Sequence, residues 1–155
     1  MSHVATGKLR VTNLEDLEAA AAQVGMTLRY GQTTFKWYGR FLGDSESGRD
    51  LSRRLPASEW GKCLHALTVN GHEREAYEVG VVKAIDGGEG YDLVFDSWGS
   101  CGRLITERCG DQLEKLAENV GAEVAMRQMA RKGYRVAREI TSDGHVQVVC
   151  TKAGA

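Results

Sequence analysis

Apolar and polar residues alternate at the start of the chain and then recur with the spacing of a helix. The stretch KLRVT, which begins at Lys8, alternates and predicts a strand. Asn13 is suited to cap the amphipathic helix that follows, and Gly25 is suited to end it. The alternation returns in MTLRY, residues 26–30. The opening of the chain therefore predicts a strand-helix-strand unit.

Aromatic rings and cations share the next segment, TTFKWYGRF, residues 33–41. In a strand, alternation would place the rings of Phe35 and Trp37 on one face and polar side chains on the other. That arrangement predicts an ordinary half-buried strand. The alternative is a binding surface, in which Tyr38 stacks on a base or nucleotide while the neighbouring cations contact phosphate. The burial of Tyr38 separates the two interpretations.

The apolar pattern is then interrupted by a polar stretch, which holds the single proline: residues 43–59, GDSESGRDLSRRLPASE. We expect a polar excursion here, with at most a short helix near residues 51–55. Three apolar segments follow, KCLHALTV, AYEVGVVKAI and YDLVFDSWG, and the connectors NGHERE and DGGEG between them are typical of turns. These segments predict three antiparallel strands.

The last third of the chain predicts a long helix and then a hairpin. Apolar residues lie close to one helical stripe between Asp111, a suitable cap, and Gly133, a suitable stop. Apolar and polar residues then alternate on both sides of the turn SDGH, residues 142–145, in the segment YRVAREITSDGHVQVVCTK. The predicted fold class is α+β. We expect one domain over residues 1–155, with two main helices packed on a mostly antiparallel sheet of about six or seven strands.

The composition supports one globular core and argues against several classes of protein. With 155 residues, 42% of them hydrophobic, the chain suits a single compact domain. A net charge of -1 lacks the positive field of a protein that coats nucleic acid or an anionic membrane, so any basic site must be local. The 4 cysteines show no CxxC spacing and suit reduced thiols. We recognise no leader or membrane-spanning segment and expect a cytoplasmic protein.

The preferred candidate site combines the aromatic segment with the polar excursion. Arginines make the excursion locally basic, and if it folds over the aromatic rings they complete a pocket for an anion or a nucleotide. A solvated loop without a binding role is the alternative. The candidate ligand-binding residues are Lys36, Tyr38, Arg40, Arg49, Arg53 and Arg54.

A second basic cluster lies at the end of the predicted long helix and in the strand after it. Cations there complement the negative C-terminal end of the helix dipole, so helix stability and solubility account for them. The alternative is contact with the phosphate backbone of a nucleic acid, which would make binding steeply dependent on salt. The candidate nucleic-acid contacts are Arg127, Arg131, Lys132, Arg135 and Arg138.

Metal and catalytic sites have little support in the sequence. Asp92 and Asp96 share one side of a predicted strand, and they could hold Mg²⁺ or perform acid-base chemistry if they converged on a cleft, as in a small metal-dependent hydrolase. Cys63 and His65 also share a strand face, but a closed zinc site needs four ligands. We therefore predict no catalytic residue, no metal and no cofactor.

Three stretches of the chain resemble a known family. They are the opening MSH with the strand and acidic helix start after it, YDLVFDSWG in the centre, and MARKGYRVAREITSDGHVQVV near the C-terminus. They resemble the uncharacterised plastid and cyanobacterial "hypothetical chloroplast open reading frame" family, a domain-of-unknown-function group with relatives in bacteria and bacteriophages. Residues 33–73 depart from the plastid pattern and look more like the phage-associated relatives. The resemblance implies a fold and a context, but no activity, cofactor or site residue.

Together these patterns favour binding over catalysis. The leading hypothesis is a small accessory protein of phage or prophage type, in the host cell cytoplasm if phage-encoded, that binds a protein partner or an anionic, nucleotide-like small ligand. The alternatives are a nucleic-acid-binding module that uses the 36–40 face and the basic cluster at 127–138, and the metal-dependent hydrolase. We expect no membrane partner, and exposed edge strands in such a sheet are compatible with a homodimer.

Overall fold

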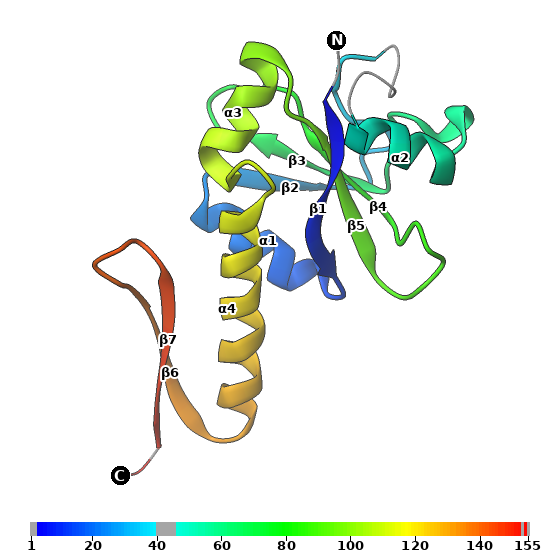
Figure 1. The fold of residues 1–155 in the computed structure, drawn as a ribbon. Coiled ribbons are helices and arrows are strands. Elements are labelled where there is room, and N and C mark those ends of the chain that lie inside the picture. Colours follow the sequence, from blue (N-terminus) through cyan, green and yellow to red (C-terminus); the bar gives the residue numbers. More distant parts are fainter. Residues whose placement is uncertain (1–2, 40–45, 153, 155) are drawn as a thin grey trace.

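The computed structural model describes residues 3–39, 46–152 and 154 (Figure 1). Its helices and antiparallel strands confirm the predicted α+β class. In chain order the elements are β1 (Val4–Val11), α1 (Leu14–Gln23), β2 (Met26–Tyr30), α2 (Glu46–Arg54), the 3₁₀ turn η1 (Ala57–Glu59), β3 (His65–Val69), β4 (Val79–Lys83), β5 (Tyr91–Asp96), α3 (Gly99–Cys109), α4 (Glu114–Arg131), β6 (Tyr134–Ile140) and β7 (Val146–Lys152).

Within the described residues, the main sheet has five strands in the order β1-β5-β4-β3-β2, and all neighbours are antiparallel. The predicted meander forms its centre, with β3, β4 and β5 side by side. The predicted strand-helix-strand unit is also present, but its two strands lie at opposite edges of the sheet. The helix between them starts as expected, because Oδ1 of Asn13 accepts hydrogen bonds from the N–H groups of Glu15 (2.8 Å) and Asp16 (3.3 Å).

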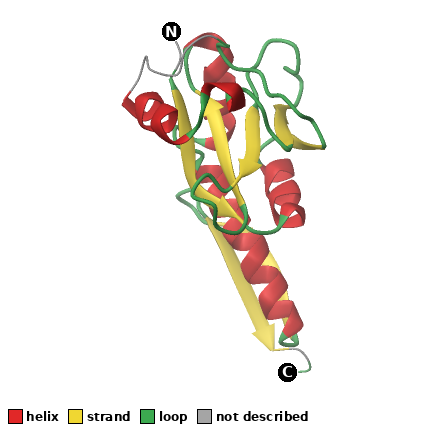
Figure 2. Cartoon of the chain, turned by 90° about the vertical axis from the view of Figure 1, so that its right-hand side faces the viewer, coloured by secondary structure: helices red, strands yellow, loops and turns green. Residues whose placement is uncertain are grey.

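Among the described residues β6 and β7 pair only with each other, and they form a hairpin outside the main sheet. The expectation of one sheet of six or seven strands is therefore wrong in this detail. α4 has 18 residues and extends about 27 Å, which carries the hairpin away from the main sheet. We call the second half of α4 and the hairpin, residues 122–152, the arm; it projects beyond the rest of the fold (Figures 1 and 2).

The larger core lies between the main sheet and α1, α3 and α4. Leu67, Leu93 and Phe95 point from the central strands into this core, where Leu17 of α1 and Ile105 of α3 are fully buried. No pattern in the sequence predicted α3, and in the structure its N-cap, Trp98, makes no side-chain capping bond. Packing against the sheet, more than a local signal, therefore stabilises this helix.

A smaller core covers the other face of the sheet, under α2. Its buried side chains include Phe35 and Leu51, and Leu55 and Trp60 pack against them. The polar excursion is therefore mostly helix and not the predicted loop with at most a short helix. Leu51 and Leu55 lie one helical turn apart, so both reach the core while the polar residues between them face solvent.

Residues 33–39 do not form the expected strand. Among the described residues their backbone makes one isolated bridge, between Thr34 and Lys62. Gly31, which follows β2, has a φ of 74°, a left-handed conformation that turns the chain out of the sheet. Phe35 is nevertheless 7% exposed, and the segment is held by this buried ring together with hydrogen bonds, among them Phe35 N–H to the carbonyl oxygen of Gly61 (3.0 Å) and Glu78 N–H to that of Lys36 (3.0 Å). Residues 40 and 41, at the end of the expected strand, lie outside the described residues.

Across the described ranges, no helix combines the length and the apolar character that crossing a bilayer requires.

Candidate functional site

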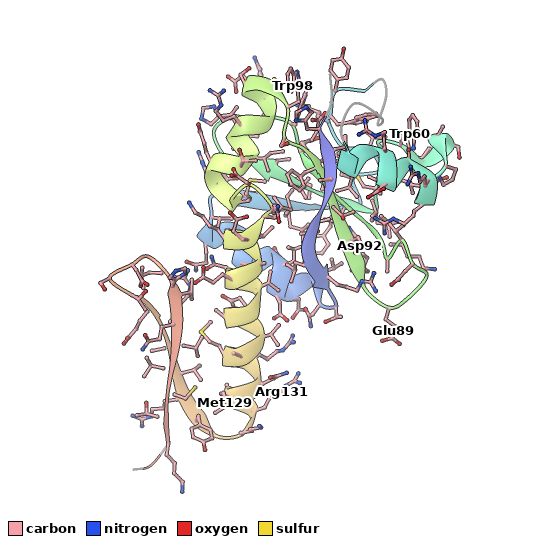
Figure 3. The ribbon with its side chains drawn as sticks, in the orientation of Figure 1. Trp60, Glu89, Asp92, Trp98, Met129 and Arg131 are labelled. Atoms are coloured by element: carbon pink, nitrogen blue, oxygen red, sulfur yellow. The ribbon has the colours of Figure 1, made fainter. Side chains whose placement is uncertain are left out.

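A groove of about 290 Å³ lies where α2 and η1 meet the end of β4. α2 is held over the sheet by Leu51, and the chain after the helix is tied back because Nε1 of Trp60 donates to the carbonyl oxygen of Leu55 (3.0 Å). Figure 3 shows Trp60 beside α2. The groove is lined by Arg54, Leu55, Glu59, Lys62, Cys63, Leu64, Val82, Lys83, Ala84 and Ile85.

Three exposed cations surround an apolar floor in this groove. Arg54, Lys62 and Lys83 form no ion pair or side-chain hydrogen bond within the described part of the chain. Glu59 is the acidic side chain among the described residues that line the groove, so cations outnumber anions there. An excess of unpaired cations over an apolar floor favours an anion that also has an apolar part.

A second hollow of about 650 Å³ continues the groove toward the β4–β5 loop. The two hollows share Leu64 and Lys83, and the second is also lined by Thr12, Glu89, Tyr91 and the glycines of the loop. Leu64 is 48% exposed and contributes apolar surface to both hollows. The continuous depression therefore has a cationic end and an end lined by Leu64 and the half-buried Tyr91.

The β4–β5 loop, which holds DGGEG, is a turn, as predicted, and ion pairs secure it. Arg10 of β1 lies 3.0 Å from the carboxylate of Asp86 and 3.5 Å from that of Asp92. The N–H of Gly88 donates to Asp86 (2.8 Å), and this bond together with Arg10 lowers the pKa of the Asp86 carboxyl. The N–H of Ile85 donates to Asp92 (2.8 Å). These contacts fix the wall of the second hollow.

The structure divides the predicted ligand-binding residues. Arg54 lines the groove, whereas Arg53 pairs with Asp50 on α2 at 3.4 Å. Arg49 is exposed on α2, and Arg40 lies outside the described residues. Nζ of Lys36 donates to the carbonyl oxygen of Glu73 (2.6 Å).

Tyr38 is half-buried, and its backbone N–H donates to Asp96 (3.0 Å). Neither Tyr38 nor Lys36 lines the groove, so the structure does not bring the aromatic segment and the arginines of α2 into one pocket.

Lys62 and Lys83 were absent from the predicted site. They lie far apart in the sequence, since Lys62 precedes β3 and Lys83 is the last residue of β4. The pairing of β3 with β4 brings their segments together, because the N–H of Leu64 donates to the carbonyl oxygen of Val81 (2.9 Å). The sequence held one signal that could have pointed to this groove: Lys62 and Leu64 are two residues apart, so they share one side of an extended segment.

The second basic cluster is also divided. Arg127 forms an ion pair of 2.8 Å with Asp16 of α1, whose side chain is 9% exposed. Arg138 donates to the amide oxygen of Asn119 on α4. These two residues therefore join parts of the fold. The remaining three cations are exposed on the arm: Arg131, Lys132 and Arg135.

The two aspartates proposed for a hydrolase do not converge. Asp92 and Asp96 are four residues apart on β5, about 13 Å along a strand. Asp92 holds the β4–β5 loop, whereas the fully buried Asp96 accepts hydrogen bonds from the N–H groups of His3 (2.9 Å), Trp98 (3.0 Å) and Tyr38. Figure 3 shows Asp92 and Trp98 toward opposite ends of β5.

No metal-binding cluster of three or more His, Cys, Asp or Glu side chains occurs in residues 3–39 and 46–152. Cys63 and His65 are separately engaged, since the Cys63 thiol donates to the carbonyl oxygen of Gln32 (3.1 Å) and Nδ1 of His65 accepts from Gly31 (2.9 Å). Burial raises the pKa of Cys63 to about 11, with a further contribution from Glu78. A thiol with this pKa is a poor metal ligand at neutral pH.

No family model, curated protein or solved structure matches this chain. The resemblance to the chloroplast open reading frame family stays a prediction from the sequence.

Proposed function

We propose that the protein binds an anionic small ligand of the nucleotide type in the groove between α2 and the end of β4. The observation that supports this most is the set of three cations, Arg54, Lys62 and Lys83, which have no ion pair among the described residues and line one continuous depression with a partly apolar floor. Surface cations normally lie near carboxylates or in open solvent, and several of them at one concave site favour a phosphate-like charge.

The shape of the depression suits a ligand with a charged end and a flat apolar end. Phosphate oxygens would lie among the cations, where Arg54 can donate two parallel hydrogen bonds and the lysines act as point charges. A base would lie over Leu64 and against Tyr91 in the adjoining hollow. Volumes of about 290 and 650 Å³ fall near or within the range of about 300–1,000 Å³ for small-molecule sites.

Thermal-shift and calorimetric titrations with ATP, AMP, pyrophosphate and adenosine test this proposal. A ligand at 100 times its dissociation constant adds about 2.7 kcal/mol of stability and raises the melting temperature by several degrees. We expect AMP and ATP to bind and adenosine, which has no phosphate, to bind far more weakly. The double variant Lys62→Glu, Lys83→Glu should abolish the shift.

Arg131→Glu combined with Lys132→Glu is the matched control, because it makes the same change of charge on the arm. This control should bind ATP like the wild type. The proposal is wrong if no nucleotide shifts the melting temperature at millimolar concentration, and a protein partner then becomes the leading hypothesis. If oligonucleotides bind and the arm variant alone abolishes that binding, nucleic-acid recognition by the arm replaces it.

A further inference from the structure

The hairpin of the arm leaves its strand edges unpaired within the described residues, since β6 and β7 pair only with each other. Tyr134 and Ile140, at the two ends of β6, are 37% and 57% exposed. An exposed two-stranded edge with apolar residues at both ends is a template for pairing with another strand. Folded proteins normally cover such an edge.

β6 presents the open edge, because α4 occupies part of the other one. The N–H of Thr141 donates to the carbonyl oxygen of His145 (2.8 Å), so by alternation the even-numbered residues of both strands direct their backbone groups away from the hairpin. The N–H of Val146 on β7 accordingly donates to Glu118 of α4 (2.5 Å). The corresponding groups of Val136 and the other even-numbered residues of β6 have no such acceptor among the described residues.

The sequence of β6, YRVAREI, is complementary to itself in the antiparallel direction. When Ala137 faces Ala137 of a second copy, Arg135 of each copy faces Glu139 of the other. In the same register Tyr134 faces Ile140, which pairs the two exposed apolar side chains. Opposite charges and apolar pairs directly across an antiparallel ladder both stabilise it.

Neighbouring registers lack this complementarity. The backbone groups that point outward belong to even-numbered residues. In any alternative register of the two β6 strands, an even-numbered residue must therefore again face an even-numbered residue. One such shift places Arg138 against Arg138, a like-charge pair. The opposite shift places Arg135 against Ala137 and Glu139 against Gly133, so both charge pairs are lost.

We propose that this protein forms a homodimer by antiparallel pairing of β6 with β6 of a second copy, with Ala137 of both copies at the two-fold axis. The two hairpins then form one four-stranded sheet, and because the axis is perpendicular to that sheet, both α4 helices cover the same face. Arg131 points away from the hairpin in Figure 3 and stays outside this interface. The groove lies at the main sheet, so dimerisation does not depend on ligand binding.

Sedimentation equilibrium between about 1 and 100 µM tests the pairing through a charge exchange. Arg135→Glu places a second carboxylate opposite Glu139, and Glu139→Arg places a second guanidinium opposite Arg135, twice in each dimer. Each single variant should weaken dimerisation about tenfold or more. The double variant, and an equimolar mixture of the two single variants, should dimerise like the wild type because opposite charges face each other again.

Arg131→Glu is the control for net charge and should leave dimerisation unchanged. Equal thermal unfolding of the variants at low concentration shows that the hairpin remains folded. A wild type that is monomeric at 100 µM would overturn the proposal. Single variants that dimerise normally, or a mixture that fails to restore the dimer, would overturn the register.

Discussion

Gly80 of β4 lies directly beneath the ring of Phe35: a Cβ at position 80 would lie 2.4 Å from Cδ1 of that ring. Gly80 pairs with Ala66 on one side and Val94 on the other, and all three belong to the face of the sheet that α2 covers. The absence of a side chain at Gly80 and the small Ala66 make room for the ring. This contact adds to the hydrogen bonds that hold residues 33–39, such as the one from the N–H of Glu78 to the carbonyl oxygen of Lys36 (3.0 Å).

Gly80→Ala should therefore destabilise the fold by about 1–3 kcal/mol, the usual cost of inserting a methyl group into a packed core. Urea denaturation at pH 7 measures the loss. Gly121 of α4 is the matched control, because a Cβ there would meet no atom within 4 Å. Gly121→Ala should stabilise the protein by about 0.5–1 kcal/mol, since alanine is the better helix former. Equal effects of the two substitutions would contradict the contact.

Asp96→Asn should destabilise the protein by about 1–3 kcal/mol. The buried carboxylate accepts three backbone hydrogen bonds, from His3 and Trp98 at Oδ1 and from Tyr38 at Oδ2. An asparagine has one acceptor oxygen, so its NH₂ group would face a backbone N–H.

Asp92→Asn is the control for that prediction, and we expect it to cost less than about 1 kcal/mol. The amide oxygen of asparagine can still accept from Ile85, and the exposed ion pair with Arg10 contributes little. Chemical denaturation of both variants gives the comparison. A loss for Asp96→Asn no larger than that for Asp92→Asn would contradict the predicted contribution of the three hydrogen bonds to Asp96.

The stability that Glu114 contributes should disappear in acid. Its carboxylate accepts from the N–H groups of Gln112 (2.8 Å) and Asp111 (3.1 Å), and these bonds, that of Gln112 first, lower its pKa from 4.5. A lowered pKa in the folded state stabilises the protein above the unfolded pKa, and this stabilisation is lost as the pH falls through the folded value.

The difference in unfolding free energy between wild type and Glu114→Gln should thus be constant between pH 6 and 8 and shrink below about pH 4.5. Urea denaturation across this range measures it. A difference that grows in acid would have the wrong sign for this carboxylate.

Cys63 and Cys109 should resist alkylation in the folded protein. Burial raises their pKa values to about 11 and about 12, so at pH 8 about one Cys63 thiol in a thousand is a thiolate, the reactive form. Cys101 and Cys150 are partly exposed and should react first with iodoacetamide. Peptide mass mapping after a short exposure at pH 8, with and without urea, identifies the modified positions. Early modification of Cys109 in the native protein would contradict its burial.

The elements that were predicted correctly are those whose sequence patterns involve only a few neighbouring residues. The cap at Asn13, the helical stripe of α4 and the SDGH turn each act locally, so the sequence alone predicts them. The predicted cap at Asp111 was wrong, because α4 begins at Glu114 and the Glu114 carboxylate binds the preceding N–H groups instead. Residues 33–39 do not form the expected strand, because a ring buried over Gly80 gives the same alternation of apolar and polar residues as a strand does.

The sequence alone was enough to predict the α+β class, helices α1 and α4, the strands of the described residues, and the presence of local basic clusters. Which of those charges lack a partner depends on the tertiary structure. Arg127 meets Asp16 because α4 lies on α1, whereas Lys62 and Lys83 share a groove because β3 pairs with β4. Such relations depend on packing between residues distant in the chain, and no pattern of neighbouring residues encodes them. The self-complementary charges of β6 were readable in the sequence, but its open edge appeared only once the hairpin lay outside the main sheet.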